Sequence, residues 1–357
     1  MKYIKQFDGI RAIAVMLVVI WHWCPRNSLI ENIHAGALGV NVFFVLSGFL
    51  ITEILLINRC KSEDSLVSKK HVLKNFYLRR MLRIFPVYYL TIFLTYMLSQ
   101  GLSLRISNNE ALSNLTYTSN FFIYITKVWP ASSLHFWSLA VEEQFYLAWP
   151  LIMLFWPKNY LLYVMVFFVA AGFASQFFMT DYEFGYLPTN TCLDCFGIGG
   201  ILAFIIVFEP DLLSKTFQWL SILCVGGIVI LIICWVMKYY LPNTRFIHAI
   251  ASGWIINFIL MNNDKKSFLA SALSSKLLTA IGKVSYGIYL YHILYVLIAN
   301  KYWYKYVYGH YPSFVNVQYD PWIFTVVNFV VLYFIAVLSW NCIEKPFLSL
   351  KQRFQYR

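Results

Sequence analysis

The stretch GIRAIAVMLVVIWHW, residues 9–23, is an apolar run with an arginine near its start and a histidine near its end. Such a run suits a helix that crosses the hydrocarbon core of a bilayer. Arg11 and His22 are eleven residues apart, close to three helical turns, so one helix face would carry both. They would lie roughly 16 Å apart along the axis. Ionisable groups inside a bilayer usually face a protein interior, so this face could line a channel or cleft. Taken singly, Arg11 could instead extend to the cytosolic interface, and His22 could be an interfacial histidine beside Trp21 and Trp23.

The composition extends this expectation to the whole chain. The 357 residues are 60% hydrophobic and 12% charged, whereas soluble globular proteins have about 25% charged residues. The net charge of +12 is expected in cytosolic loops, and nucleic-acid binding is not expected because no soluble basic module is present. The sequence therefore predicts one all-α, polytopic membrane domain over residues 1–357.

Ten apolar segments are candidate membrane-spanning helices, for which about 20 residues are needed. They are 10–24, 36–57, 79–100, 134–156, 159–178, 192–208, 217–237, 246–262, 282–300 and 321–341. Ten crossings place both termini on one side of the membrane. Most of the 28 lysines and arginines fall on that side, so the positive-inside rule places both termini in the cytosol. The longest polar connections are then 58–78 on the cytosolic side and 101–133 on the outer side.

An arginine cluster lies at the cytosolic depth of Arg11. The sequence YLRRMLRIFP contains Arg79, Arg80 and Arg83, whose spacing groups them on one side of a helix. Such a cluster ordinarily anchors a helix at the cytosolic surface. Planar guanidinium groups beside Arg11 would also suit the phosphates of a nucleotide.

Carboxylates and further polar groups lie at the outer depth of His22. LHFWSLAVEEQFYLAWP, residues 134–150, places Glu142 and Glu143 roughly 12 Å into the membrane from outside. Adjacent residues point in different directions, so only one of these glutamates is expected to face a given site. Ser138 and Glu142 share a helix face.

A polar stripe runs along the ninth candidate helix. Its sequence SYGIYLYH places Ser285, Tyr289 and His292 on one face. Hydrogen bonds between helices would explain such a stripe on their own. Two intramembrane histidines and a glutamate pair at compatible depths favour a functional site instead.

The chain resembles the membrane-bound acyltransferase type 3 family over nearly its whole length. The motifs that carry the resemblance are FDGIRAIAVMLVVIWH, GVNVFFVLSGFLI, RRMLRIFP, FWSLAVEEQFYLAWP, GKVSYGIYLYHILY and IEKPF, in this order. The resemblance implies a bacterial inner-membrane O-acyltransferase with a cytosolic acyl-CoA, usually acetyl-CoA, as co-substrate. It implies a hydroxyl of a surface polysaccharide or lipid-linked sugar precursor as the acceptor. It also implies that His22 is the essential histidine, and that Arg11 and the RRMLR arginines bind the donor or organise the site.

Residues and resemblance together predict a mechanism. His22 would act as general base on the acceptor hydroxyl, because imidazole titrates nearest neutral pH. Glu142, or less readily Glu143, would orient His22 or stabilise its cation. Tyr289, His292 or Trp137 would donate to the thioester oxyanion. A covalent acyl-histidine intermediate is the alternative mechanism.

Three further features lie outside this mechanism. Ser47 and Gly48 in FFVLSGF are small residues that let helices pack closely. Glu344 in IEKPF is expected to form a salt bridge with the arginine cluster. Cys192 and Cys195 in CLDC are most simply an incidental pair, although a redox motif or a disulfide is conceivable. No metal site and no permanently bound cofactor are expected, since the Cys and His residues lack zinc-ligand spacing. A fused extracytoplasmic domain, present in some family members, is not expected.

A proton-coupled transporter is the alternative class of function. Such carriers also place His, Glu and Arg side chains inside the membrane. The sequence lacks paired Gly- or Pro-interrupted segments in two halves, and a carrier does not need an arginine cluster aligned with a deeper histidine. Among acyltransferases, the alternative is an enzyme with a small hydrophobic acceptor.

Overall fold

The computed structural model of the protein describes residues 3–24, 34–179, 181, 183–237, 244–262, 267–303, 306 and 321–356. Within these residues every regular element is a helix. The long helices are α1 (Lys5–Trp23), α3 (Ala35–Glu63), α4 (Lys69–Leu102), α7 (Phe136–Phe155), α8 (Leu161–Phe178), α9 (Leu193–Phe208), α10 (Leu213–Val236), α11 (Arg245–Asn262), α14 (Ser285–Ile298) and α17 (Pro321–Ser339). Each of the ten predicted segments overlaps one of them, and the predicted all-α membrane bundle is confirmed.

Shorter elements connect the long helices. They are α5 (Asn108–Leu115), α6 (Ser119–Thr126), α12 (Phe268–Leu273), α13 (Lys276–Lys283) and α18 (Lys345–Ser349), the 3-10 turns η1 (Lys158–Tyr160), η2 (Thr189–Cys192), η3 (Pro210–Leu212) and η7 (Leu350–Arg353), and the π turns η4 (Ala299–Trp303) and η6 (Trp340–Glu344). The predicted outer connection 101–133 contains α5 and α6.

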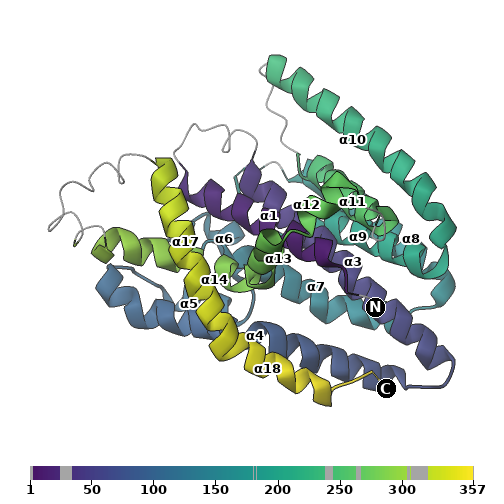
Figure 1. Cartoon of the computed structure of the whole chain (residues 1–357), viewed down its shortest axis with the longest axis horizontal. Helices are drawn as coiled ribbons and strands as arrows, with labels where there is room; N and C mark the ends of the chain where they lie inside the picture. Colours follow the sequence, from purple (N-terminus) through teal and green to yellow (C-terminus); the bar gives the residue numbers. More distant parts are fainter. Residues whose placement is uncertain are drawn as a thin grey trace.

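Six helices of the described chain are long and apolar enough to cross a membrane. A seventh span results if the pair α13 and α14, bent by 68°, is counted as one. A helix can cross lipid because it satisfies its own backbone polar groups. With several such apolar helices, the chain is a multi-pass membrane protein. The two termini lie near the same end of the molecule in Figure 1, with α5 at the opposite end. Ten crossings and cytosolic termini stay predictions.

The helix that carries the arginine cluster is longer than predicted. α4 begins at Lys69, and Ser68 caps it, because the Ser68 Oγ accepts a hydrogen bond from the backbone N–H of His71 at 3.2 Å. Most of the predicted cytosolic connection 58–78 is therefore helical. Pro86 lies in the interior of α4 and not within its first turns.

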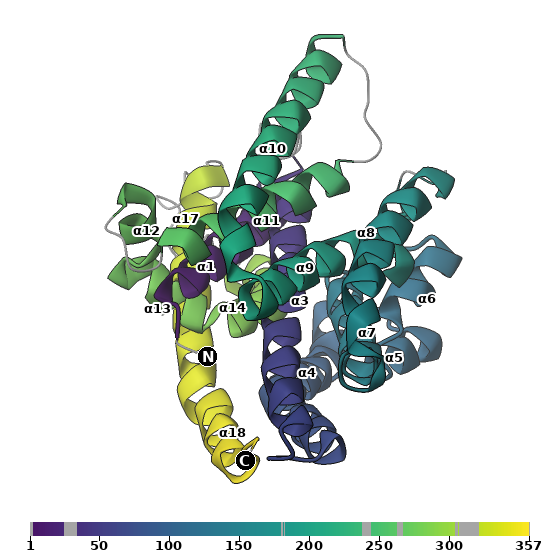
Figure 2. The same ribbon diagram turned by 90° about the vertical axis from the view of Figure 1, so that its right-hand side faces the viewer.

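The central helix α3 crosses α9 at very short range (Figures 1 and 2). A Cβ atom built on Gly199 would lie 2.1 Å from the Val45 carbonyl oxygen. One built on Gly48 would lie 2.5 Å from that of Phe196. Small residues at membrane helix interfaces allow such close backbone approach. The close packing predicted at Gly48 is confirmed, and it fixes the wall of α3 that faces the site.

The helix α10 projects from the bundle and packs mainly against α11, as Figures 1 and 2 show. Its side chains include many exposed large apolar groups, among them Trp219, Ile222, Val225 and Ile233. Such a surface suits lipid tails and not water. The polar groups discussed below come from the other side of the molecule, from α1, α3, α4, α7 and α14.

Candidate active site

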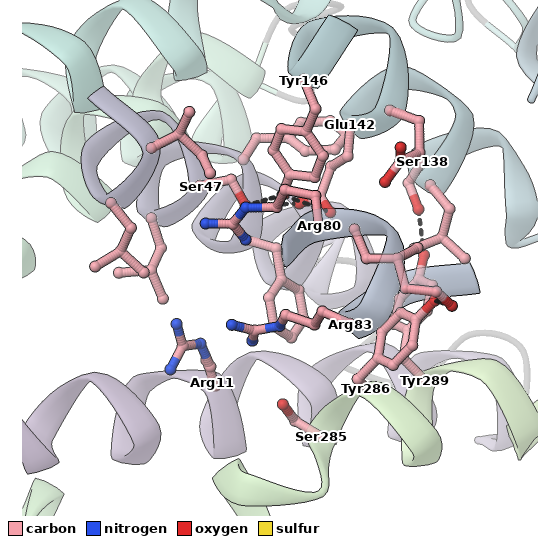
Figure 3. A pocket seen from close by; sticks show the side chains of 18 of the residues that line it. Arg11, Ser47, Arg80, Arg83, Ser138, Glu142, Tyr146, Ser285, Tyr286 and Tyr289 are labelled. Atoms are coloured by element: carbon pink, nitrogen blue, oxygen red, sulfur yellow. Dashed lines mark hydrogen bonds between the residues drawn. The ribbon is translucent and has the colours of Figure 1, made fainter. Parts of the chain in front are cut away.

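A cavity of about 270 Å³ lies among α1, α3, α4, α7 and α14 (Figure 3). We call it the main cavity. Its polar lining residues are Arg11, Ser47, Arg80, Arg83, Ser138, Glu142, Glu143, Tyr146, Ser285, Tyr286 and Tyr289, and apolar side chains of α3 and α4 complete the wall. The residues predicted at the cytosolic depth and those predicted at the outer depth thus share one cavity.

Arg11 lines this cavity and points into it (Figure 3). Its Nη1 donates to Asp8 Oδ1 at 2.9 Å, one helical turn away. Asp8 is buried and also accepts a hydrogen bond from the Tyr3 hydroxyl. Asp8 was not among the predicted site residues, although its i, i+3 spacing from Arg11 was the available signal.

The three arginines of α4 divide into two groups. Arg80 and Arg83 line the main cavity together with Arg11. The Arg80 guanidinium lies over the Tyr146 ring, 5.4 Å from its centroid. Arg79 instead donates from Nη1 to the carbonyl oxygens of Lys351 and Phe354, each at 3.1 Å. The predicted grouping therefore holds for two of the three.

A second cavity of about 480 Å³ adjoins the main cavity, and we call it the basic cavity. It is lined by Ile54, Ile57, Asn58, Lys61, Arg79, Arg80, Arg83, Lys351, Gln355 and Tyr356. Five of these residues are lysines or arginines and none is acidic. Ile54, Arg80 and Arg83 line both cavities. A cavity lined by basic side chains thus lies beside one lined by apolar groups, hydroxyls and carboxylates.

Both glutamates of α7 line the main cavity, so the prediction that only one would face a given site is wrong. The cavity is wide enough that two adjacent side chains of α7, which leave the helix in different directions, both reach it. Ser47 Oγ donates to Glu142 Oε1 at 2.9 Å, and the Tyr146 hydroxyl lies 3.3 Å from Glu142 Oε2. Glu143 Oε1 is buried and has no hydrogen-bond partner among the described residues.

His22 contacts His292 and not Glu142. The His22 Nδ1 lies 2.8 Å from the Val18 carbonyl oxygen and 3.2 Å from His292 Nε2. The predicted Glu142–His22 pairing is therefore not formed in the structure. Glu142 is held by α3 and by its own helix, whereas α14 brings His292 against the end of α1.

The hydrogen-bond partners determine the tautomers of both histidines. A carbonyl oxygen only accepts, so His22 Nδ1 carries a hydrogen. His292 Nδ1 lies 2.6 Å from the Tyr289 carbonyl oxygen and carries one for the same reason. Neutral His292 then has a lone pair on Nε2, and the His22 Nδ1–H is shared between this lone pair and the Val18 carbonyl oxygen. In this arrangement His22 Nε2 carries no hydrogen, and neither does Nε2 of neutral His292.

A third histidine completes this group, which we call the histidine cluster (His22, His135 and His292). The ring centroids of His135 and His292 are 4.7 Å apart. His135 and His292 are buried, while His22 retains some exposed surface. His135 was not among the predicted site residues. No pattern within one helix indicates its position, because the contact joins the start of α7 to α14.

Tyr289 links the histidine cluster to the main cavity. It lines the cavity, its ring centroid lies 5.7 Å from that of His292, and its hydroxyl lies 2.5 Å from Ser138 Oγ. Tyr289 and Ser138 are therefore the hydroxyl groups of the main cavity that adjoin the histidine cluster. The predicted polar stripe of α14 does converge with α7, as Figure 3 shows for these two side chains.

Two predicted site residues lie elsewhere. The Trp137 ring packs against Tyr186 at a centroid distance of 5.4 Å, and Trp137 does not line the main cavity. Glu344 is buried in η6, and its Oε1 has no hydrogen-bond partner among the described residues. The expected salt bridge from Glu344 to the arginine cluster is not formed, because this carboxylate faces Gly287 of α14.

The two cysteines of the CLDC motif are free thiols in a separate buried cluster. Arg245 Nη1 lies 2.9 Å from Cys192 Sγ and 3.0 Å from the Thr191 carbonyl oxygen. Cys195 Sγ lies 3.7 Å from Asn41 Oδ1. Hydrogen bonding between α9 and its neighbours accounts for the pair without a disulfide.

Comparison with known proteins identifies the family. A family model described as an acyltransferase domain, of acyltransferase type 3, matches residues 4–341. The O-acetyltransferase OatA of Staphylococcus aureus is 29% identical over 97% of this chain and 57% of its own length. The peptidoglycan O-acetyltransferase OatA of Listeria monocytogenes is 30% identical over 97% of this chain and 56% of its own length. No solved structure matches the chain significantly.

The chain therefore spans little more than half the length of these curated relatives. The family match covers the helices that form the main cavity and the histidine cluster, which bear the motifs of the first helix, α4, α7 and α14. The match over nearly the whole chain agrees with the resemblance seen in those motifs, and the protein belongs to the acyltransferase type 3 family.

Proposed function

We propose that the protein transfers an acetyl group from cytosolic acetyl-CoA to a hydroxyl of a surface glycan or its lipid-linked precursor. The observation that carries this proposal is that the basic cavity and the main cavity have a common wall. They share Ile54, Arg80 and Arg83, and Tyr289 at the inner end contacts the histidine cluster. The main cavity thus borders both a group of basic side chains and, through Tyr289, the histidine cluster that contains His22.

The charge of the basic cavity supports a nucleotide donor. Coenzyme A carries a pyrophosphate and a ribose phosphate at one end and a thioester at the end of a long, thin arm. Guanidinium groups bind phosphate oxygens through paired hydrogen bonds. Five lysine and arginine side chains without an acid in one cavity suit such a polyanion. The narrower main cavity would then receive the arm, with Arg11 facing Arg80 and Arg83 across it.

The tautomers of the histidine cluster support general-base catalysis by His22. Its Nε2 would remove the proton of the acceptor hydroxyl as that oxygen attacks the thioester carbonyl carbon. The carbon–sulfur bond breaks when the tetrahedral intermediate collapses, and the thiolate of CoA receives the proton from Nε2. The products are the acetyl ester and free CoA.

Two neighbouring groups would stabilise charge during this reaction. The His22 imidazolium would keep its Nδ1–H directed at the His292 Nε2 lone pair, 3.2 Å away. Tyr289 and Ser138 are the hydroxyl donors in reach of an oxyanion at the inner end of the cavity. Glu142 acts in this scheme on the donor side, because its charge lies beside Arg80 and Arg83.

The acceptor class rests on the relatives and on the exposure of His22. Both OatA proteins are named O-acetyltransferases, and the Listeria protein is named for peptidoglycan. His22 retains exposed surface at the end of α1 farther from Arg11. An acceptor would approach His22 from this outer end while the donor occupies the main cavity.

The test uses sealed inside-out membrane vesicles from cells that express the protein. Acetyl-CoA labelled in the acetyl group is added to the exposed cytosolic face, and label in lumenal glycan is measured. We expect label with the wild type, none with His22→Ala, and none in right-side-out vesicles. Equal labelling by the wild type and His22→Ala would refute the role of His22. Wild-type protein that neither labels glycan nor binds acetyl-CoA after purification would refute the proposed function.

A further inference from the structure

The residues 350–356, which we call the tail segment, form one wall of the basic cavity. Lys351, Gln355 and Tyr356 line this cavity opposite α3 and α4. The tail segment follows α18 and lies beyond residue 341, where the family match ends. None of its residues was predicted as part of the site.

The tail segment is attached to α4 through its own backbone. Asn75 Nδ2 donates to the Gln355 carbonyl oxygen at 2.7 Å, and His71 Nε2 lies 3.3 Å from the same oxygen. Arg79 donates to two further carbonyl oxygens of the segment and lies over the Tyr356 ring, 5.2 Å from its centroid. These bonds fix the backbone and leave the Lys351 side chain directed to the cavity.

The same bonds divide the cationic groups by role. Arg79 uses Nη1 and its ring contact to hold the tail segment, so much of its hydrogen-bonding capacity is occupied. Lys351 has no ion pair with an acidic side chain among the described residues, and it lies close to the arginines of α4. Positive charges this close repel one another, so an anion bound among Lys351 and these arginines is electrostatically favourable.

We propose that the tail segment completes the binding site for the phosphate-bearing end of the donor. Lys351 contacts the phosphates, and Arg79 is a positioning residue that holds the segment in place. This inference rests on the proposed function, since it takes acyl-CoA as the donor. It adds a wall of the site that lies outside the region matched by the family model.

The test measures binding of two probes to purified protein in a neutral detergent without anionic lipid. Acetyl-CoA carries the phosphates, and S-acetylpantetheine has the same thioester without them. For Lys351→Gln we expect acetyl-CoA binding to weaken about 10-fold, as for loss of one hydrogen bond to a charged group, and S-acetylpantetheine binding to stay unchanged. Lys345→Gln is the matched control, because Lys345 is exposed and lines neither cavity.

Arg79→Gln tests the positioning role. It should weaken acetyl-CoA binding and also speed tryptic cleavage at Arg353, which Lys351→Gln should not do. The inference is overturned if Lys351→Gln binds acetyl-CoA like Lys345→Gln, or if it weakens both probes equally. In those cases the wild type still binds acetyl-CoA and the proposed function stands. Failure of the folded wild type to bind acetyl-CoA would overturn both.

Discussion

Replacement of His292 should slow the chemical step without weakening donor binding. In the structure His292 Nε2 accepts from His22 Nδ1–H at 3.2 Å, and His292 does not line the main cavity. The bond becomes a hydrogen bond from a charged donor once His22 is protonated in the reaction. Such bonds contribute about 1.5–3 kcal/mol. Because about 1.4 kcal/mol corresponds to a tenfold change in rate, His292→Phe should lower kcat about 10- to 150-fold.

Two variants separate this role from packing. Phenylalanine fills the buried site but offers no acceptor, whereas the Oε1 of glutamine can replace the Nε2 lone pair. His292→Gln should therefore recover much of the rate lost in His292→Phe. The assay is release of free CoA thiol by purified protein with acetyl-CoA and a soluble glycan acceptor, with kcat and KM measured separately.

Three results would refute this reasoning. Activity of His292→Phe within about twofold of the wild type would show that the bond to His22 is not used in catalysis. Equal loss in the Gln and Phe variants, both folded, would indicate a packing role. A raised KM for acetyl-CoA with unchanged kcat would place His292 in donor binding, against its position outside the cavity.

Other residues give shorter tests. Tyr289→Phe, measured by the same thiol release, should lower kcat about 10²-fold, as loss of an oxyanion donor does; an unchanged kcat would exclude that role. Gly199→Val should prevent recovery of folded protein on size exclusion because its Cβ would meet the Val45 carbonyl, whereas Gly226→Val, with open space, should not. The hydrogen bond from Lys127 lowers the pKa of Asp181. The hydrogen bond between Lys127 and Asp181 therefore stabilises the fold fully above about pH 4, the pKa of an aspartate in the unfolded chain. This stabilisation is lost as the pH falls through the lower pKa of Asp181 in the folded protein. In thermal melts, the wild type should lose this stabilisation at low pH and Asp181→Asn should not. The same dependence of Tm on pH in both proteins would refute this prediction.

The sequence alone determined the elements of this protein and the pairs that lie within one helix. The length of the apolar segments indicated the long helices, since lipid offers no hydrogen-bond partners to backbone N–H and C=O groups outside a helix. Helical spacing grouped Arg80 with Arg83 and placed Ser138 and Glu142 on one face of α7. Small residues marked the close crossing of α3 at Gly48. All these inferences depend on local geometry, which has the same period in every helix.

Contacts between helices were decided by the tertiary structure. His22 and His292 are 270 residues apart in the sequence but in contact in the structure. Glu142 accepts a hydrogen bond from Ser47 and does not pair with His22. The tail segment joins the basic cavity through backbone carbonyls, which no side-chain pattern encodes. In a membrane protein, lipid-facing and protein-facing surfaces are both apolar, so hydrophobic periodicity does not reveal which helices are neighbours. Partner choice then depends on crossing angle and on close approach at small residues, and these exist only once the helices have packed.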